Sequence, residues 1–374
     1  MADTQRDGAL ERLRGKHVCI CVGAGGVGKT TTAAALALGL AARGGRVAVV
    51  TIDPAPRLAD ALGLEALSGE PARVDATALA AAGIEMRGEL WAMRLDPKRT
   101  LDGLVSRLAP DSRAREEILA NPIYRELSSA VAGAQELSAV VKLYELRHER
   151  DFDVIVLDTP PARNAVDFLE APARLLGFLE GRALKVFLAP GGIAARVFGR
   201  STGLAFAIFA RVTGVDMLGD LSRFFRSLAG VTDAFGERTR RVAALLRDRS
   251  TTFMLVTTPE PVPAREAALL AERLDAAGMG RCGVIVNRVQ RAGLDGRTPA
   301  EVQAQLAPAL GERLAARAAA NLADFDVLSR RDGETIARLC EAVSEPSPLL
   351  VPHLDEDIGD LAGLACVAGY LFAS

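Results

Sequence analysis

The sequence predicts an α/β fold in which a doubly wound, mostly parallel sheet is covered by helices, with helical insertions that form a subdomain. Short, continuously apolar runs rich in β-branched residues recur along the chain, and stretches with helical patterning separate them. Apolar runs that do not alternate with polar residues are typical of parallel strands buried on both faces. The alternation of strands and helices is typical of a doubly wound sheet. The predicted strands are residues 17–22, 46–52, 153–157, 252–257 and 283–286.

The predicted helices complete this pattern. Residues 31–43 are rich in alanine and leucine and are followed by Gly44 and Gly45, a common way for a helix to end. Residues 360–372 are apolar without flanking lysines, which predicts a packed core helix, whereas the proline-containing segment 344–352 is interpreted as a rigid loop.

Two long segments, 98–146 and 171–249, lack strand patterns and are helical in pattern. We expect them to form one helical subdomain beside a core of residues 1–97, 147–170 and 250–374. Two interpretations remain open. The helices are either ordinary core helices, or they form an exposed apolar groove that receives a ligand or a client segment.

Composition narrows the class of protein. The chain has 374 residues, of which 49% are hydrophobic and 25% charged, so it can bury a core and form about two domains or one large elaborated domain. A net charge of −2 gives no reason to expect nucleic-acid binding. Five cysteines without a CxxC pair argue against a disulfide framework and a thiolate zinc site. The polar N-terminus and the absence of an apolar run of about 18 residues predict a cytoplasmic protein without a transmembrane segment.

Residues 23–30, GAGGVGKT, satisfy the phosphate-loop pattern G-x-x-x-x-G-K-[ST] between a predicted strand and a predicted helix. Glycines let successive backbone N–H groups face one anion, and the helix that follows adds its positive N-terminal end. Lys29 is expected along the β- and γ-phosphates, and the Thr30 hydroxyl is expected to ligate Mg²⁺. The sequence therefore predicts a nucleoside triphosphate site, with nucleotide contacts from Gly23, Gly25, Gly26, Val27, Gly28, Lys29, Thr30 and Thr31.

Two aspartates end predicted strands where such a site needs carboxylates. Asp53 follows strand 46–52, and Asp158 follows strand 153–157. Ligands of open parallel sheets bind outside the carboxyl ends of the strands, so both residues should face the phosphate loop. One carboxylate can hold Mg²⁺ directly or through water, and the other can orient an attacking water. The alternative for either aspartate is a helix N-cap.

Motifs along most of the chain resemble the ArsA/guided-entry ATPases, the anion-transporting ATPase family that includes proteins targeting tail-anchored clients. The resemblance rests on VGAGGVGKTTTAAALAL, TIDPAPRLADALG, AQELSAVVKLYEL, LDTPPARNAVDFLEAP, RDRSTTFMLVTTPEPVPAREA, VIVNRV and LLVPHLDEDIGDLAGL, in that order.

The resemblance implies a role for each matching residue. Asp53 corresponds to the catalytic aspartate of switch I, which positions the attacking water and is a possible metal contact. Asp158 corresponds to the magnesium-side aspartate of switch II. Asn287 corresponds to the asparagine that reads adenine, and Pro352 lies in the loop that closes over the base. The implied cofactors are ATP and Mg²⁺. Because the chain has one phosphate loop, the resemblance implies a homodimer whose helical insertions act on an unknown client or membrane partner.

Three departures from the family pattern limit what the resemblance implies for this chain. The signature lysine of the family's phosphate loop is Ala24 here, which removes a positive charge from the site. Switch I carries Pro56 and Arg57 where histidine and a small polar residue are usual; Arg57 is either a substitute charge or a solvated loop residue. The CxxC that joins eukaryotic dimers through zinc is absent after Asn287.

Three functions fit these observations. The first is a Mg²⁺-dependent ATPase whose conformational cycle acts on a partner or client, supported by Lys29, Asp53 and Asp158. The second is a nucleotide-gated chaperone or scaffold with little hydrolysis, supported by Ala24. The third is a positioning ATPase of the ParA/MinD type, against which stand the long helical insertions and the lack of a basic amphipathic C-terminal helix.

Overall fold

A computed structural model of the chain describes residues 8–122, 124–125, 128, 134–160, 232–294, 296–355 and 357–373. Most of the predicted insertion 171–249, and with it the candidate client groove, lies outside the described residues.

The chain separates into two compact units. The first comprises residues 1–94, 151–165 and 249–374, and the second comprises residues 95–150 and 166–248. The boundaries expected from sequence were 97/98, 146/147, 170/171 and 249/250. The assignment of the units to an ATPase core and a helical client subdomain stays a prediction.

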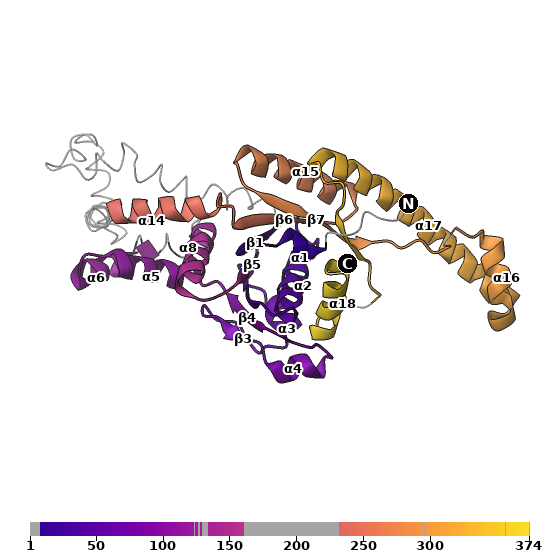
Figure 1. Ribbon diagram of the computed structural model, residues 1–374, viewed down its shortest axis with the longest axis horizontal. Helices are drawn as coiled ribbons and strands as arrows, with labels where there is room; N and C mark the ends of the chain where they lie inside the picture. The colour runs from indigo at the N-terminus through magenta and orange to yellow at the C-terminus, as the bar shows by residue number, and fades with distance from the viewer. Residues whose placement is uncertain are drawn as a thin grey trace, which may run out of the picture. The chain divides into compact units, whose positions relative to one another are not determined.

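The first unit contains an eight-stranded sheet with the order β3-β4-β2-β5-β1-β6-β7-β8 (Figure 1). Every neighbouring pair is parallel except β3–β4, which confirms the predicted fold class. The strands are β1 (Val18–Val22), β2 (Arg46–Thr51), β3 (Ala72–Arg73), β4 (Glu89–Arg94), β5 (Val154–Asp158), β6 (Thr251–Thr257), β7 (Arg281–Val289) and β8 (Leu349–Pro352).

All five predicted strands are present, but β3, β4 and β8 were not predicted. The interpretation of residues 344–352 as a rigid loop was wrong, because their last four residues form β8 and pair with β7. A strand of four residues that ends in proline carries too little pattern to be recognised. β4 mixes buried with partly exposed residues and so lacks the continuous apolar run of the central strands.

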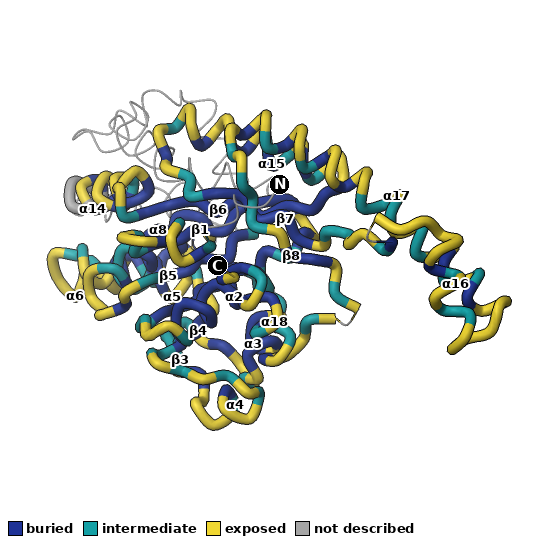
Figure 2. The backbone as a smooth tube through the Cα atoms, turned by 45° about the vertical axis from the view of Figure 1, so that its right-hand side comes forward, coloured by how far each residue is buried: buried dark blue, intermediate teal, exposed yellow. Residues whose placement is uncertain are grey.

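Helices cover both faces of this sheet. The first unit contains α1 (Ala9–Arg12), α2 (Lys29–Ala42), α3 (Arg57–Ala61), α4 (Ala76–Ala81), α15 (Pro261–Ala276), α16 (Pro299–Leu310), α17 (Glu312–Val343) and α18 (Leu361–Leu371). α2 packs against α18 on one face, while α15 and α17 lie together on the other (Figures 1 and 2). α18 buries five of its side chains, as predicted for a core helix.

The packing around α2, the helix that follows the loop 23–28, holds this helix in place. Nearly all of α2 is buried (Figure 2), and its Gly39 lies against the Phe372 ring, where an added Cβ would come within 2.2 Å of a ring carbon. Such close packing leaves little freedom for α2 to shift along the sheet. The N-terminus of α2 is therefore held at the end of β1.

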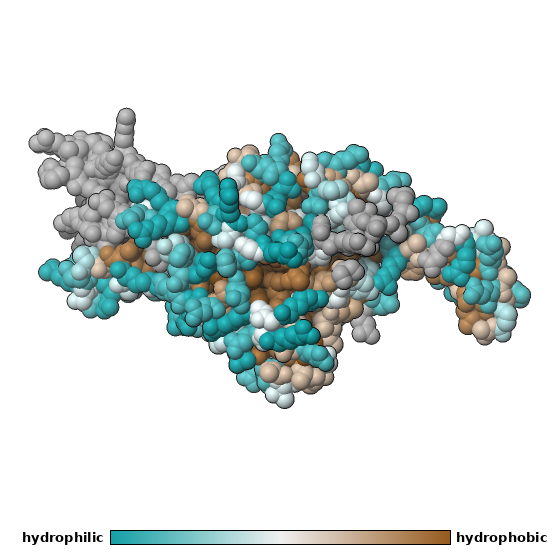
Figure 3. All heavy atoms as spheres, viewed as in Figure 1, coloured by the Kyte–Doolittle hydropathy of each residue, from teal (hydrophilic) through white to brown (hydrophobic). Residues whose placement is uncertain are grey.

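A helical hairpin follows β7. α16 packs on α17 around a small apolar cluster of Leu294, Val302 and Ala319. Leu310 and Leu314 are exposed near the turn between the two helices, and Figure 3 shows apolar atoms at the surface of this hairpin. The capping box of Thr298 and Glu301 explains why α16 begins at Pro299.

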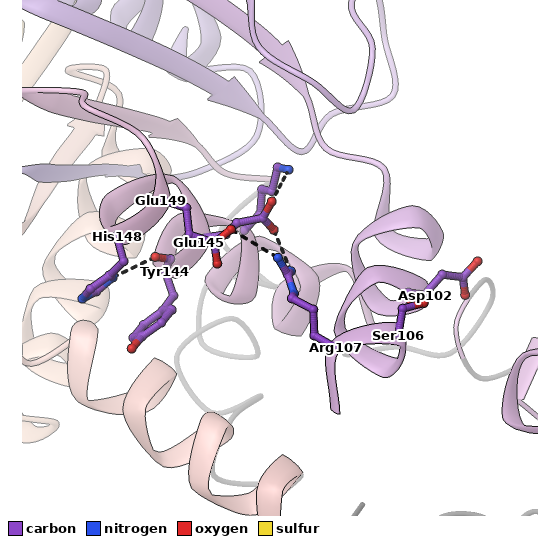
Figure 4. A network of polar contacts seen from close by, with 8 residues as sticks. Asp102, Ser106, Arg107, Tyr144, Glu145, His148 and Glu149 are labelled. Carbon is purple, nitrogen blue, oxygen red and sulfur yellow. Dashed lines mark hydrogen bonds and ion pairs between the residues drawn. The ribbon is translucent and has the colours of Figure 1, made fainter. Parts of the chain in front are cut away.

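The described part of the second unit is helical, as predicted for 98–146. It contains α5 (Pro97–Leu108), α6 (Ser112–Ala120), α8 (Ala134–Glu149) and α14 (Thr232–Leu245), with α8 packed against α5 and α14. Arg107 joins α5 to α8 by ion pairs to Glu145 (3.0 Å) and Glu149 (3.3 Å) (Figure 4). Burial acts to raise the pKa of Glu145, but Arg107 and Lys142 outweigh it and lower that pKa. No helix in the described ranges has the length and apolarity needed to cross a membrane.

Candidate functional site

The candidate site lies at the carboxyl ends of three adjacent strands, in the order β2-β5-β1. In the sheet, β5, β2, β4 and β3 lie on one side of β1, whereas β6, β7 and β8 lie on its other side. Such a reversal of strand order opens a crevice at the carboxyl edge of an open parallel sheet. The loop 23–28 follows β1 directly and so lies at this crevice.

The loop conformation requires glycine. Gly26 and Gly28 adopt left-handed φ angles of 78° and 91°. A Cβ at Gly23 would lie 1.9 Å from the Val256 carbonyl oxygen, and one at Gly28 would lie 2.3 Å from Asn287 Nδ2. α2 then begins at Lys29 without a side-chain cap. The first N–H groups of a 14-residue helix therefore remain for an anion.

Lys29 is buried and folds back onto its own loop. Its Nζ donates a hydrogen bond to the Ala24 carbonyl oxygen at 2.7 Å. Burial lowers the pKa of Lys29, and the negative charges of Asp158 and Asp53 oppose that shift. An ammonium group in this position can exchange a neutral carbonyl for a phosphate oxygen, which is a much better partner for a desolvated cation.

Asp158 ends β5 and is 1% exposed. Its Oδ2 accepts hydrogen bonds from the hydroxyls of Thr30 (2.7 Å) and Thr51 (2.9 Å). Its Oδ1 accepts none from the part of the chain that the structure describes. Burial raises the pKa of Asp158, and the two hydroxyls and the charge of Lys29 act against this shift. The carboxylate is therefore buried and only half satisfied.

These residues fit a magnesium ion bound together with a phosphate. Among the described residues, no group of three or more His, Cys, Asp or Glu side chains could hold a metal by itself. Mg²⁺ prefers oxygen ligands, keeps several waters and often takes one or two protein oxygens together with substrate phosphates. Thr30 and Asp158, joined by a hydrogen bond, supply such oxygens, and Asp158 Oδ1 is a buried oxygen still without a partner.

Asp53 follows β2 and is held by its own backbone turn. Its Oδ1 accepts from Ala55 N (3.0 Å), and its backbone N donates to Thr51 Oγ1 (3.1 Å). Its Oδ2 lies 3.5 Å from Arg57 Nη1. The N-cap of α3 is Pro56, so Asp53 does not serve as the cap of the helix that follows it.

Asn287 and Pro352 lie on the other side of β1. Asn287 Nδ2 donates to the Val27 carbonyl oxygen (2.9 Å), and Asn287 Oδ1 accepts from Arg288 N (3.0 Å). Asn287 thus contacts the phosphate loop itself. Pro352 pairs with Val289 at the sheet edge. That these two residues contact an adenine base stays a prediction.

Sequence reasoning missed two hydroxyls. Thr51 links Asp158 to the backbone of Asp53, and Thr159 Oγ1 donates to the Cys21 carbonyl oxygen (2.7 Å) at the end of β1. The available signal was the position of Thr51, two residues before Asp53 at the end of a predicted strand. That signal is weak, because threonine is common in buried strands for its β-branched shape alone.

Comparison with known proteins shows the family of the chain. The sequence model described as "Anion-transporting ATPase" matches residues 16–295, which include the phosphate loop, Asp53, Asp158 and Asn287. A protein of Halobacterium salinarum named "Putative arsenical pump-driving ATPase" is 32% identical over 151 residues, or 40% of this chain. The match covers 23% of that relative's length. Since the family match covers most of the chain, the protein belongs to the anion-transporting ATPase family.

Proposed function

We propose that the protein is a Mg²⁺-dependent ATP hydrolase of the ArsA/guided-entry type, in which ATP binding and hydrolysis drive a conformational change that acts on a partner or client. The observation that carries this proposal is the buried Asp158, whose Oδ2 contacts Thr30 of the phosphate loop while Oδ1 has no partner among the described residues. Leaving a buried carboxylate oxygen unsatisfied costs about 1–3 kcal/mol or more, and a bound cation would offset this cost.

The chain's own groups have distinct tasks in this reaction. Lys29 leaves the Ala24 carbonyl for the γ-phosphate, and the N-terminus of α2 holds the phosphate oxygens. Thr30 and Asp158 would hold the magnesium ion, which when bound neutralises charge on the β- and γ-phosphate oxygens. Asp53 orients the attacking water through a carboxylate that is partly open to solvent. The bond from the γ-phosphorus to the ADP oxygen then breaks as the bond to water forms.

The partners are also proposals. One phosphate loop per chain supports a homodimer, and the sequence features support a cytoplasmic protein that contacts a client or membrane partner through its second unit. The alternative of a nucleotide-gated chaperone with little hydrolysis is supported by Ala24, because that loop position supplies a carbonyl group but no side-chain charge.

Phosphate release by the purified protein with ATP and Mg²⁺ tests this proposal. Lys29→Ala serves as the blank, because it removes the phosphate-binding cation. Lys16→Ala serves as the matched control, because Lys16 Nζ instead binds the Arg249 carbonyl oxygen at the amino end of β1. We expect turnover by the wild type and Lys16→Ala, which stops when Mg²⁺ is chelated, and none by Lys29→Ala.

Two results would contradict the proposal in different ways. Equal ATP affinity of wild type and Lys29→Ala by calorimetry would remove the site assignment. Tight, Lys29-dependent ATP binding without turnover would replace the hydrolase with the nucleotide-gated alternative.

A further inference from the structure

The phosphate site contains less positive charge than its substrate needs. Lys29 is buried at the loop, and the second loop residue, Ala24, offers only its carbonyl oxygen. A triphosphate carries more negative charge than one lysine and one Mg²⁺ neutralise. Phosphoryl transfer depends on further cations to stabilise the charge on the transferred group. Another cation near the loop would therefore have a clear task.

Arg57 is a cation that contacts a carboxylate of the candidate site. It is the first residue of α3, and its Nη1 is 3.5 Å from Oδ2 of Asp53, the carboxylate assigned to the attacking water. The positive charge of Arg57 also contributes to the lowered pKa of Lys29. The guanidinium group thus lies within electrostatic reach of both Lys29 and Asp53.

The Arg57 side chain is exposed, whereas the backbone that carries it is packed on both sides. Leu58 and Ala59, the next residues of α3, are buried in the core around α2. On the other side of the turn, Arg94 Nη1 donates to the Pro54 carbonyl oxygen (3.4 Å). The Arg57 side chain, by contrast, is 72% exposed.

The ion pair of Arg57 is weak enough to be exchanged. A solvent-exposed pair four residues apart contributes little to stability. A phosphate offers a guanidinium two oxygens at once and carries more charge than one carboxylate. A γ-phosphate bound at Lys29 would therefore compete successfully with Asp53 for Arg57.

We propose that Arg57 is a γ-phosphate-sensing catalytic residue that pairs with Asp53 in the nucleotide-free protein and transfers to the γ-phosphate when ATP binds. The exchange has two effects: it adds a positive charge to the transferred phosphoryl group, and it releases the Asp53 carboxylate to orient water. ADP lacks the γ-phosphate and leaves the Asp53–Arg57 pair intact. This inference rests on the proposed ATPase function.

The test compares ATP and ADP affinity by calorimetry, and turnover, in wild type, Arg57→Ala and Arg57→Lys. The matched control is Arg14→Ala, which removes an exposed arginine paired with Glu11 on the same unit. For Arg57→Ala we expect kcat to fall by about 10- to 1,000-fold, below the full range for arginine contacts to phosphoryl groups because Arg57 is exposed. We also expect weaker ATP binding with unchanged ADP affinity. Arg57→Lys should recover part of both losses, since it keeps the charge without the planar fork.

Each contrary result has a separate meaning. Wild-type kcat and an unchanged ratio of ATP to ADP affinity in Arg57→Ala would overturn the proposal while leaving the ATPase assignment intact. An equal loss of ATP and ADP affinity would also overturn it, because Arg57 would then not sense the γ-phosphate. If wild type binds and hydrolyses ATP no better than Lys29→Ala, the ATPase assignment fails first, and the Arg57 proposal fails with it.

Discussion

Two buried aspartates of the first unit have the same exposure and different surroundings. Asp158 at the end of β5 and Asp332 in α17 are each 1% exposed. Asp332 Oδ2 accepts from Gln290 N (3.0 Å), and its Oδ1 lies 3.5 Å from Arg331 Nη2. Asp158 lies at the candidate site, where only its Oδ2 accepts hydrogen bonds from the described residues.

We interpret this difference as one between a structural buried carboxylate and one that is proposed to bind a ligand. Asp332 and Asp326 of α17 both accept backbone N–H groups of the segment that follows β7, with Asp326 Oδ1 bonded to Gly293 N (2.9 Å) and Leu294 N (3.1 Å). These carboxylates supply acceptors for the backbone N–H groups of that segment. At the carboxyl edge of β1, β2 and β5, Asp158 instead has one carboxylate oxygen without a partner among the described residues. Native proteins rarely leave such groups unsatisfied without a reason.

The largest expected effect is on turnover, at the candidate site. Asp53→Asn keeps an oxygen that can accept from Ala55 N, so the loop should retain its conformation and ATP affinity should stay within a few-fold. Turnover should fall by about 10²–10⁴-fold, the usual contribution of a positioned acid–base group. Phosphate release under single-turnover conditions checks this, with the exposed Asp60→Asn of α3 as control. Turnover equal to wild type would remove Asp53 from the mechanism.

An intermediate effect is expected on stability, at the contact between α17 and the segment that follows β7. Asp332→Ala leaves Gln290 N without its buried acceptor, which should lower the free energy of unfolding by about 1–3 kcal/mol. The exposed Asp324→Ala on the same helix should change it by less than about 0.5 kcal/mol. Urea unfolding measures both, and ATP affinity should remain unchanged. Loss of ATP binding at unchanged stability would mean that this contact is functional rather than structural.

The smallest expected effect is the stability of Asp158→Asn without ligand. Because burial raises the pKa of Asp158 in the folded protein, its ionised form opposes folding. The protonated form of Asp158 therefore contributes to the free energy of unfolding. This contribution is complete below the unfolded pKa of about 3.9 and is lost as pH rises through the raised pKa of the folded protein. At neutral pH the ligand-free variant should therefore be at least as stable as wild type.

With ATP and Mg²⁺ bound, wild type should be more stable than Asp158→Asn. At a ligand concentration of 100 times Kd, wild type should gain about 2.7 kcal/mol from ATP with Mg²⁺. The variant should gain no more with Mg²⁺ than with EDTA, because it lacks the carboxylate ligand. Thermal unfolding with and without Mg²⁺ measures both quantities. A ligand-free variant that unfolds more readily than wild type, with its Mg²⁺ response intact, would make Asp158 structural, like Asp332.

The local sequence pattern was sufficient to predict the central strands, α2 and the residues of the phosphate loop. A parallel strand buried on both faces is a continuous apolar run, and residues 23–30 are constrained individually by backbone conformation and phosphate chemistry. The adjacency of Asp158 and Thr30 was also predictable, because parallel strands present their carboxyl ends at one edge.

The sequence by itself determined the α/β class, the phosphate loop and the strand-end aspartates, since each depends on neighbours close in the chain. Only the tertiary structure decided that β4 and β8 extend the sheet, that Thr51 joins Asp53 to Asp158, and that Asp332 anchors the chain after β7. These features depend on contacts between residues far apart in the chain or on side-chain direction. The same type of residue, a buried aspartate, is structural or functional according to which hydrogen-bond donors the fold brings to it.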